Sequence, residues 1–308
     1  MYNPHLQLLA LPYKPQIAVM KPFLLICCCL FAGSTYAQQI PTRWDELNAT
    51  DWPAALEKSA QTCILPIGIL EKHGPHAPLG NDLIHVREIT ARVVKNEYAV
   101  VFPDYFYGQI NEARSQPGTF SLPAKLILEL LQATCDEIAR NGFKKIVIIN
   151  GHGGNPEFLH FFMQDLLNKR HNYAVFLYEP ANDAAYNKDM AKLHKSDSGG
   201  DYHAGERETS TTMALRPDLV HLDRAGMQSG ENQKRLALNN LYTPIWWYAS
   251  FPNHYAGDAS KSSLELGKMI VDHEVATFTD ALKQVQADTK TIPLQNEYYD
   301  KVDKVGKY

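Results

Sequence analysis

The first group of residues that could do chemistry lies in the segment 71–82, which carries glutamate, histidine and aspartate side chains. Glu71 and His73 are two residues apart, so in extended backbone their side chains point the same way. Asp82 follows after a loop rich in glycine and proline that can fold back toward them. Carboxylates and imidazoles are ligands for zinc or manganese, and a carboxylate can bridge two ions. The alternative is an ordinary surface loop, where charged side chains are common.

The second group is the segment 150–155, Asn-Gly-His-Gly-Gly-Asn, with His152 near its middle. It directly follows a β-branched run and directly precedes a helical pattern. Ligands of open parallel sheets gather at the carboxyl ends of the strands, which is where this segment falls. A phosphate-binding turn is one alternative, but the segment has neither GxGxxG nor GKS or GKT. A simple tight turn is the other, and it leaves His152 unexplained.

The third group is the segment 203–210, His-Ala-Gly-Glu-Arg-Glu-Thr-Ser, at the start of a predicted helix. A capped helix with an acidic first turn accounts for Glu206 and Glu208, because anions are favourable near a helix N-terminus. It does not account for His203. We therefore treat His203 and Glu208 as candidate site residues.

Alternating strand and helix patterns must position these three groups. The strand patterns are continuous apolar runs, which is typical of parallel strands covered on both faces. We predict strands at residues 63–70, 99–105, 144–150 and 173–178. We predict helices at 83–97, 125–140, 156–169 and 264–287, a further helix starting near residue 209, and a polar surface excursion at 188–202. The sequence thus indicates an α/β fold with a mostly parallel central sheet.

Length and composition limit the class of protein. The 308 residues, 45% hydrophobic and 21% charged, suffice for a buried core and exclude a disordered or fibrous chain. The net charge of −4, without a long basic run, argues against nucleic acid or an anionic membrane surface as a partner. Cys63 and Cys135 lie in apolar runs typical of buried, inert thiols, with one disulfide between them as the alternative.

Residues 1–37 have the layout of an upstream extension followed by a secretory signal peptide, with a charged start near Met20 and an apolar run at 23–31. A membrane anchor is the alternative, but nine strongly apolar residues are too few, because a helix needs about 20 to span a bilayer. We predict that residues 1–37 are removed, leaving a single domain over 38–308. Its predicted location is periplasmic or extracellular, without a membrane anchor. Met1 and Met20 are alternative starts.

Together the three groups resemble the creatininase (creatinine amidohydrolase) family. The resemblance rests on LPIGILEKHGPHAPLGND at 65–82, NGHGGN at 150–155, HAGERETS at 203–210 and a weaker GDA at 257–259. It implies a three-layer αβα sandwich with two divalent metal ions in a cleft, zinc first and manganese or iron as alternatives. It also implies a homo-oligomer, with a hexamer as the expected form.

The resemblance implies metal-binding roles for four residues of the first two groups. Glu71 and His152 would hold one metal ion, and His73 would hold the other. Asp82 would bridge the two ions.

Two residues of the third group receive further roles from the resemblance. Glu208 would be a metal ligand or the base that handles the water, and His203 would donate a proton to the leaving nitrogen. Creatininase has a further acidic ligand where this chain has Gly154. The second metal ion would therefore either lose that ligand or recruit another, and Glu208 is the expected replacement.

The expected reaction is the attack of metal-activated water on a C–N bond of a small, cyclic amide. Two close metal ions lower the pKa of a water molecule and polarise a carbonyl group, and a histidine can protonate the departing amine. The sequence has no GxSxG motif, which disfavours a covalent acyl-enzyme. A deformylase or lactam hydrolase on the same scaffold, or a metal-dependent binding protein without turnover, are the alternatives. The roles of His76, Trp246 and Trp247 are left open.

Overall fold

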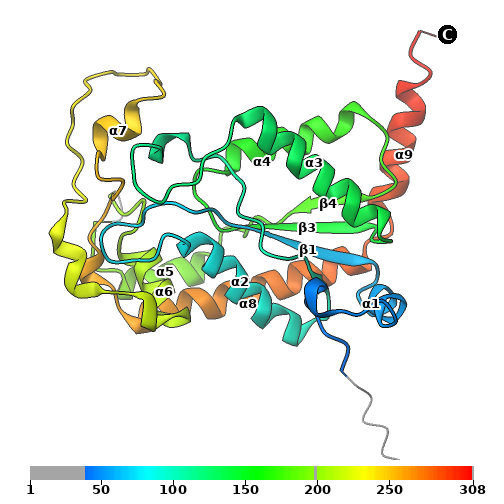
Figure 1. Cartoon of the computed structure of the whole chain (residues 1–308), viewed down its shortest axis with the longest axis horizontal. Coiled ribbons are helices and arrows are strands. Elements are labelled where there is room, and N and C mark those ends of the chain that lie inside the picture. The colour runs from blue at the N-terminus through cyan, green and yellow to red at the C-terminus, as the bar shows by residue number, and fades with distance from the viewer. Residues whose placement is uncertain (1–38, 198–199, 307–308) are drawn as a thin grey trace, which may run out of the picture. The chain divides into compact units, whose positions relative to one another are not determined.

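The computed structural model describes residues 39–197 and 200–306 (Figure 1). Residues 40–308 form one compact unit, which contains every helix and strand named below. The predicted signal segment and its cleavage after residue 37 lie outside the described residues. The division of the chain at that point therefore stays a prediction.

Four parallel strands form the central sheet, in the order β2-β1-β3-β4. The strands are β1 (Thr62–Ile67), β2 (Val100–Val101), β3 (Lys145–Asn150) and β4 (Ala174–Leu177). The α-helices are α1 (Trp52–Lys58), α2 (Asn81–Asn96), α3 (Ala124–Arg140), α4 (Pro156–Asp165), α5 (Ala184–Leu193), α6 (Glu206–Leu215), α7 (Trp246–Ser250), α8 (Leu264–Ala287) and α9 (Thr291–Val302). The predicted α/β fold with a parallel sheet is confirmed.

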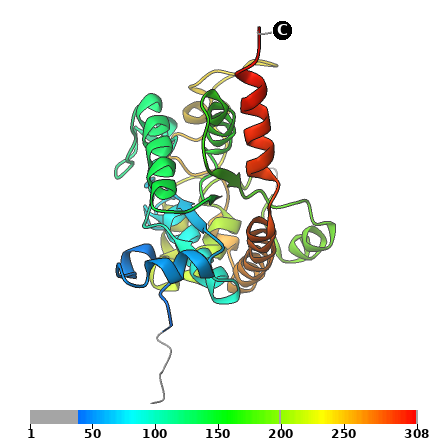
Figure 2. The same cartoon turned by 90° about the vertical axis from the view of Figure 1, so that its right-hand side faces the viewer.

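Helices cover both faces of the sheet, as Figures 1 and 2 show, because alternate strand residues point to opposite sides. Leu65 and Ile148 pack into a core cluster with α3 and α4. Ile64 and Val147 pack into a second cluster with α2 and α8. Strands buried on both faces carry no polar alternation, which explains their continuous apolar sequences.

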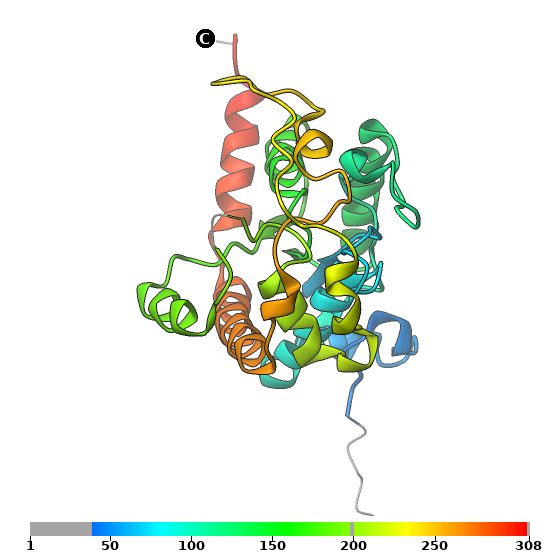
Figure 3. The same ribbon diagram turned by 90° about the vertical axis from the view of Figure 1, so that its left-hand side faces the viewer.

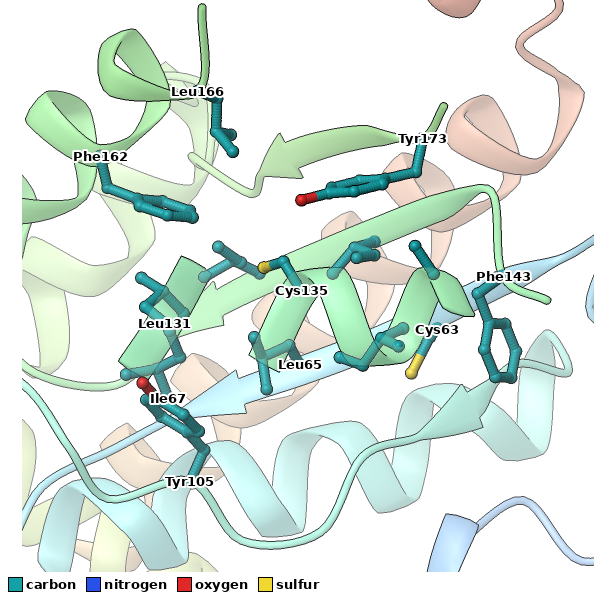
Figure 4. Close-up of a cluster of buried hydrophobic side chains, with 14 of the residues drawn as sticks. Cys63, Leu65, Ile67, Tyr105, Leu131, Cys135, Phe143, Phe162, Leu166 and Tyr173 are labelled. Atoms are coloured by element: carbon teal, nitrogen blue, oxygen red, sulfur yellow. The ribbon is translucent and has the colours of Figure 1, made fainter. Parts of the chain in front are cut away.

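Helix α3 shows how the first cluster is built (Figure 4). Leu131, Cys135 and Ile138 follow one another at helical spacing and are fully buried against the sheet. Burial of a large aliphatic side chain stabilises a fold by roughly 1.5–3 kcal/mol. Cys63 and Cys135 are both free thiols, so the disulfide alternative is wrong. Burial raises the pKa of both thiols, which keeps them protonated and unreactive.

Several predicted boundaries shift where long-range contacts decide the backbone. The strand predicted at 99–105 pairs only over β2, apart from an isolated bridge between Tyr105 and Ile67. The polar segment predicted at 188–202 lies at the surface as expected, but its first part belongs to helix α5, which the sequence did not predict. None of the residues of α5 is buried, so no apolar stripe marked it, and the Asp183 carboxylate caps it by accepting the N–H groups of Ala185 and Tyr186.

The strands end at one edge of the sheet, on the left in Figure 1 and facing the viewer in Figure 3. Segments from the second half of the chain, yellow and orange in Figure 3, cross in front of this edge. All three sequence groups lie here. No helix in the described part of the chain is long and apolar enough to cross a membrane.

Candidate metal centre

Helix α2 begins directly against the ends of β1 and β3, and this places Asp82 between them. A Cβ atom at Gly68 would lie 2.4 Å from the Leu83 Cα, and one at Gly151 would lie 2.6 Å from the Asp82 carbonyl oxygen. Only glycine permits so close an approach at either position. The two glycines therefore let the Asp82 carboxylate sit between the residues that follow the two strands.

His152 follows β3 and points its Nδ1 atom at two carboxylates. Nδ1 lies 2.8 Å from Glu71 Oε1 and 3.0 Å from Asp82 Oδ2. On the other side of the ring, Nε2 is 2.8 Å from the Gln109 carbonyl oxygen. A carbonyl oxygen only accepts, so Nε2 carries the proton and donates it. Burial opposes protonation of the ring, but the facing Glu71 and Asp82 carboxylates raise the pKa of His152 well above its usual value. A bound cation would replace the proton on Nδ1, and the neutral ring would then present a lone pair to it, as metal-binding histidines do.

His73 repeats this arrangement with its nitrogen atoms exchanged. Its Nδ1 donates to the Glu71 carbonyl oxygen at 3.3 Å. Its Nε2 lies 2.9 Å from Asp82 Oδ1 and 3.6 Å from Glu208 Oε2. The Asp82 carboxylate therefore lies between two imidazoles, with one oxygen directed at each.

The arrangement of these buried atoms suits the binding of a divalent cation better than it suits hydrogen bonding among themselves. Among the described residues, Glu71 Oε1, His73 Nε2 and Asp82 Oδ2 have no hydrogen-bond partner, although other polar atoms lie within 3.0 Å. Buried polar groups without partners are costly, and a shared cation satisfies several lone pairs at once. Two groupings bring candidate ligand atoms within 4.8 Å of one another: Glu71 with Asp82 and His152, and Glu71 with His73 and His203.

The electrostatics keep both central carboxylates ionised. Burial alone would raise the pKa of Glu71, but the charge of the facing His152 imidazole and the hydrogen bond from His254 hold it well below its usual range. Burial likewise opposes ionisation of Asp82, and the neighbouring His73 ring keeps its pKa lowered. Against the effect of burial, these carboxylates in turn raise the pKa of His73 to about 10. A cation bound between the two carboxylates would therefore replace protons on the facing imidazoles.

His203 lies beside this centre, held by the segment that precedes α8. Its backbone forms two hydrogen bonds with Ala256, at 2.9 and 3.0 Å. Its Nε2 donates to the Lys72 carbonyl oxygen at 2.8 Å, and its Nδ1 lies 3.8 Å from Glu208 Oε2. Burial lowers the pKa of His203 despite the nearby Glu71 carboxylate. The ring is therefore neutral at pH 7, with its unprotonated nitrogen on the Glu208 side.

Glu208 and Glu206 have different roles in the structure. The Glu208 side chain is 36% exposed, accepts the Ala204 N–H at 2.7 Å and faces His73 and His203. Glu206 is fully buried on another side of α6, where it accepts the backbone N–H groups of Lys195 and Ser196. Only Glu208 belongs to the candidate centre.

The N-terminus of α6 is capped by a residue that lies outside the segment 203–210. Asp201 accepts the N–H groups of Glu206 and Arg207, at 2.8 and 3.1 Å. This cap lets the helix begin at Glu206, three residues before the predicted start. The predicted capped helix with an acidic first turn is confirmed, with Glu206 and Glu208 in that turn.

The glycine at position 154 is required by the orientation of the His152 ring. A Cβ atom at Gly154 would lie 2.5 Å from His152 Nε2 and 3.2 Å from Glu112 Oε1. An acidic side chain at 154 and the observed His152 ring therefore exclude one another. Glu208 supplies the carboxylate next to His73 instead.

Two of the residues whose roles were open lie outside the centre. His76 Nε2 donates to Thr209 Oγ1 at 2.9 Å, and this hydroxyl donates onward to the Ala204 carbonyl oxygen. Burial lowers the pKa of His76 to about 4, so His76 is a neutral structural residue. Trp246 is exposed, and its ring packs edge-on against that of Trp247.

Sequence reasoning missed one residue that touches the centre. His254 is buried, and its Nε2 forms a hydrogen bond with Glu71 Oε2. The Trp247 indole N–H donates to His254 Nδ1 at 2.7 Å. His254 lies 183 residues after Glu71, so no local spacing could connect the two.

A cavity of about 420 Å³ adjoins the centre. It reaches Asp82, His203 and Glu208 at one side, and its wall continues to Tyr186 and Arg207. This volume lies within the range of small-molecule sites.

Comparisons with known proteins agree with this geometry. The family model described as creatinine amidohydrolase matches residues 45–282. A 3-dehydro-scyllo-inosose hydrolase of Thermotoga maritima is 27% identical over 68% of this chain and 73% of its own length. The creatinine amidohydrolase of Pseudomonas putida is 31% identical over 58% of this chain and 74% of its own. A mycofactocin precursor peptide peptidase of Mycolicibacterium smegmatis is 32% identical over 52% of this chain and 60% of its own.

Solved structures show the same fold. A crystal structure of creatininase superposes with a TM-score of 0.65 at 25% identity, covering 80% of this chain and 99% of that one. Two further creatininase structures, described as Zn-Zn type and as Mn, superpose with TM-scores of 0.66 and 0.65, each at 24% identity over 80% of this chain and 99% of theirs. The three-layer fold and the predicted resemblance are confirmed. The chain belongs to the creatininase family.

Proposed function

We propose that this protein is an exported, divalent-metal-dependent amidohydrolase that adds water across a C–N bond of a small, cyclic amide. The observation that carries the proposal is the convergence of unpartnered atoms at Glu71, His73 and Asp82, beside imidazoles whose other nitrogens donate to backbone carbonyls. Such pre-oriented ligand sets are typical of metal centres. The known family members named above are all hydrolases, which supports the reaction type.

Five side chains would hold the metal ions. Glu71, His152 and one oxygen of Asp82 suit one position, and His73, the other Asp82 oxygen and Glu208 suit the second. Zinc is the first choice and manganese or iron the alternatives, because all three accept imidazole and carboxylate ligands. When bound, the ions would lower the pKa of a water molecule and polarise the substrate carbonyl group.

Glu208 and His203 would move the protons. Glu208 is the most exposed carboxylate of the set and faces the cavity, where it can accept a proton from water. The unprotonated Nδ1 of His203 lies on the same side and can take up that proton and donate it to the leaving nitrogen. The carbonyl carbon gains the hydroxyl group and the nitrogen gains the hydrogen, so water is consumed in full.

The cavity favours a small substrate over a peptide. Its volume of about 420 Å³ suits a single ring with a few substituents. A lactam or a formamide would fit the same space, so lactam hydrolysis and deformylation are the alternatives within the same chemistry. A metal-dependent binding protein is the alternative without turnover, and it would not need a proton relay at His203.

The test is metal content per chain together with a hydrolysis panel. The full chain is expressed, the cell compartments and the medium are separated, and the protein is purified from the fraction that contains it. The panel comprises creatinine, other cyclic amides, lactams, formamides and short peptides. About two metal ions per chain with turnover of a cyclic amide is the expected result.

Each other outcome revises one part of the proposal. One ion per chain with turnover would restrict the reaction to a single metal, and metal without turnover on any compound would favour the binding protein. Metal-free purified protein that takes up no added metal would contradict the metal centre. Protein with an intact N-terminus in the cytoplasm would contradict export, and size measurement in solution checks the proposed homo-oligomer.

A further inference from the structure

We infer that His254, oriented by Trp247, is a positioning residue that selects which oxygen of Glu71 binds metal. This inference rests on the proposed metal centre. It concerns two residues that lie outside all three sequence groups and that the proposed proton transfers do not use. Trp247 lies in α7, which Figure 1 labels, and His254 follows four residues after the end of this helix.

The direction of both hydrogen bonds follows from the chemistry of the indole ring. Trp247 Nε1 lies 2.7 Å from His254 Nδ1, and an indole N–H can only donate. His254 Nδ1 is therefore the acceptor, and the proton of the neutral ring sits on Nε2. Nε2 then donates to Glu71 Oε2. Trp247 thus sets the tautomer that His254 presents to Glu71.

This hydrogen bond makes the two oxygens of Glu71 unequal. Oε2 accepts from His254, whereas Oε1 has no hydrogen-bond partner among the described residues and lies 2.8 Å from His152 Nδ1. The carboxylate is therefore set to bind one ion through Oε1 alone. Of the two candidate groupings, this favours Glu71 with Asp82 and His152 over Glu71 with His73 and His203.

The backbone around His254 is held in an uncommon conformation. His254 has a φ of 52°, in the left-handed region that residues other than glycine rarely occupy. Its N–H donates to the Phe251 carbonyl oxygen at 2.9 Å, and the preceding Asn253 carbonyl oxygen accepts from Lys72 Nζ at 2.7 Å. Strained residues persist only where surrounding contacts determine them, and they concentrate at functional sites. The Lys72 contact ties the loop directly to the segment that carries Glu71.

Both hydrogen bonds, from Trp247 to His254 and from His254 to Glu71, can be tested with a variant and a matched control. Trp247→Phe removes only the N–H that sets the tautomer, and Trp246→Phe makes the same change on the neighbouring indole. His254→Leu removes the donor to Glu71. His254→Gln keeps an N–H donor that can reach the position of Nε2.

The experiment measures metal binding directly, with zinc and then cobalt(II) as the probes. The full-length protein is stripped with a chelator and titrated in competition with a chromophoric chelator, and the cobalt form is followed by its visible absorption bands. Trp247→Phe and His254→Leu should weaken the tighter site by about 10–100-fold, as is typical for lost outer contacts, and shift the cobalt bands. His254→Gln should recover most of the affinity, and Trp246→Phe should match the wild type.

The outcomes separate this inference from the proposed function. If the wild type binds metal and Trp247→Phe has unchanged affinity and cobalt bands, the inference is overturned while the metal centre stands. If Trp246→Phe weakens binding as much as Trp247→Phe, the effect is general packing and the inference is again overturned. The expected affinity pattern without turnover of any panel compound would support the inference and contradict the hydrolase. A wild type that binds neither metal would contradict both.

Discussion

Asp82 Oδ1 lies 2.9 Å from His73 Nε2, and the imidazole of His73 reaches it only because α2 starts against the ends of two strands. The other Asp82 oxygen lies 3.0 Å from His152. One carboxylate thus connects residues that follow different strands, which is the geometry expected of a bridging metal ligand.

Replacement of Asp82 by asparagine should empty both metal positions. The amide keeps the shape of the side chain but removes the negative charge and one acceptor. Turnover should fall by about 10³-fold or more, because bound metal contributes several kcal/mol to the transition state. Metal analysis and steady-state kinetics check this. Asp104→Asn, which breaks an exposed ion pair with Arg87, should leave both unchanged. Full metal content in Asp82→Asn would refute the bridging role.

Replacement of His203 by alanine should separate metal binding from turnover. We expect two ions per chain to remain, with kcat lowered by about 10²–10⁴-fold through loss of proton transfer. The measurement is metal content beside kcat and KM on the same preparation. His160→Ala, at an exposed histidine that pairs with Glu179, is the control. Loss of metal in His203→Ala would instead make this residue a ligand.

The pair Glu208→Gln and Glu206→Gln tests the division of tasks on α6. Glu208→Gln should lower metal affinity and turnover with little change in stability, because its side chain is partly exposed. Glu206→Gln should lower the free energy of unfolding by about 1–3 kcal/mol, since the buried carboxylate accepts backbone N–H groups. Denaturant unfolding and metal titration on both variants check this. The opposite pattern would mean that the two roles are exchanged.

The pair Gly154→Ala and Gly153→Ala tests the space beside His152. A Cβ at Gly154 would meet the His152 ring at 2.5 Å, whereas one at Gly153 meets nothing within 4 Å. Gly154→Ala should displace the ring from Gln109 and weaken metal binding by about tenfold or more. Gly153→Ala should bind metal as the wild type does. Equal affinities in the two variants would show that the ring position does not control the site.

The lowered pKa of His76 predicts that the folded protein loses stability in acid. Burial lowers its folded-state pKa to about 4, whereas an unfolded histidine titrates near 6.5. The unfolded state therefore binds more protons between these values, and stability falls as pH drops from about 6.5 to 4. His76→Gln should remove on the order of 2 kcal/mol of this decrease. Urea unfolding of chelator-treated protein across this range checks it, with His160→Gln as the control. Identical pH profiles for wild type and His76→Gln would contradict the prediction.

The sequence by itself determined the fold class and most of the candidate centre. Continuous apolar strands and periodic helices such as α3 report burial on both faces of a sheet, because burial imposes a local pattern. The Glu71–His73 spacing and the position of His152 after β3 place these residues at the same edge of the sheet, which follows from parallel strands alone.

Only the tertiary structure decided how these side chains are oriented. The bond from His254 to Glu71 joins residues 183 apart, and the bond from His152 to Gln109 joins two separate loops. The same holds for Glu206 and Glu208, which lie close together in the sequence but contact different parts of the chain in the structure. Local spacing limits which residues can share a face, but the direction of a polar side chain is set by partners that packing brings from elsewhere in the chain.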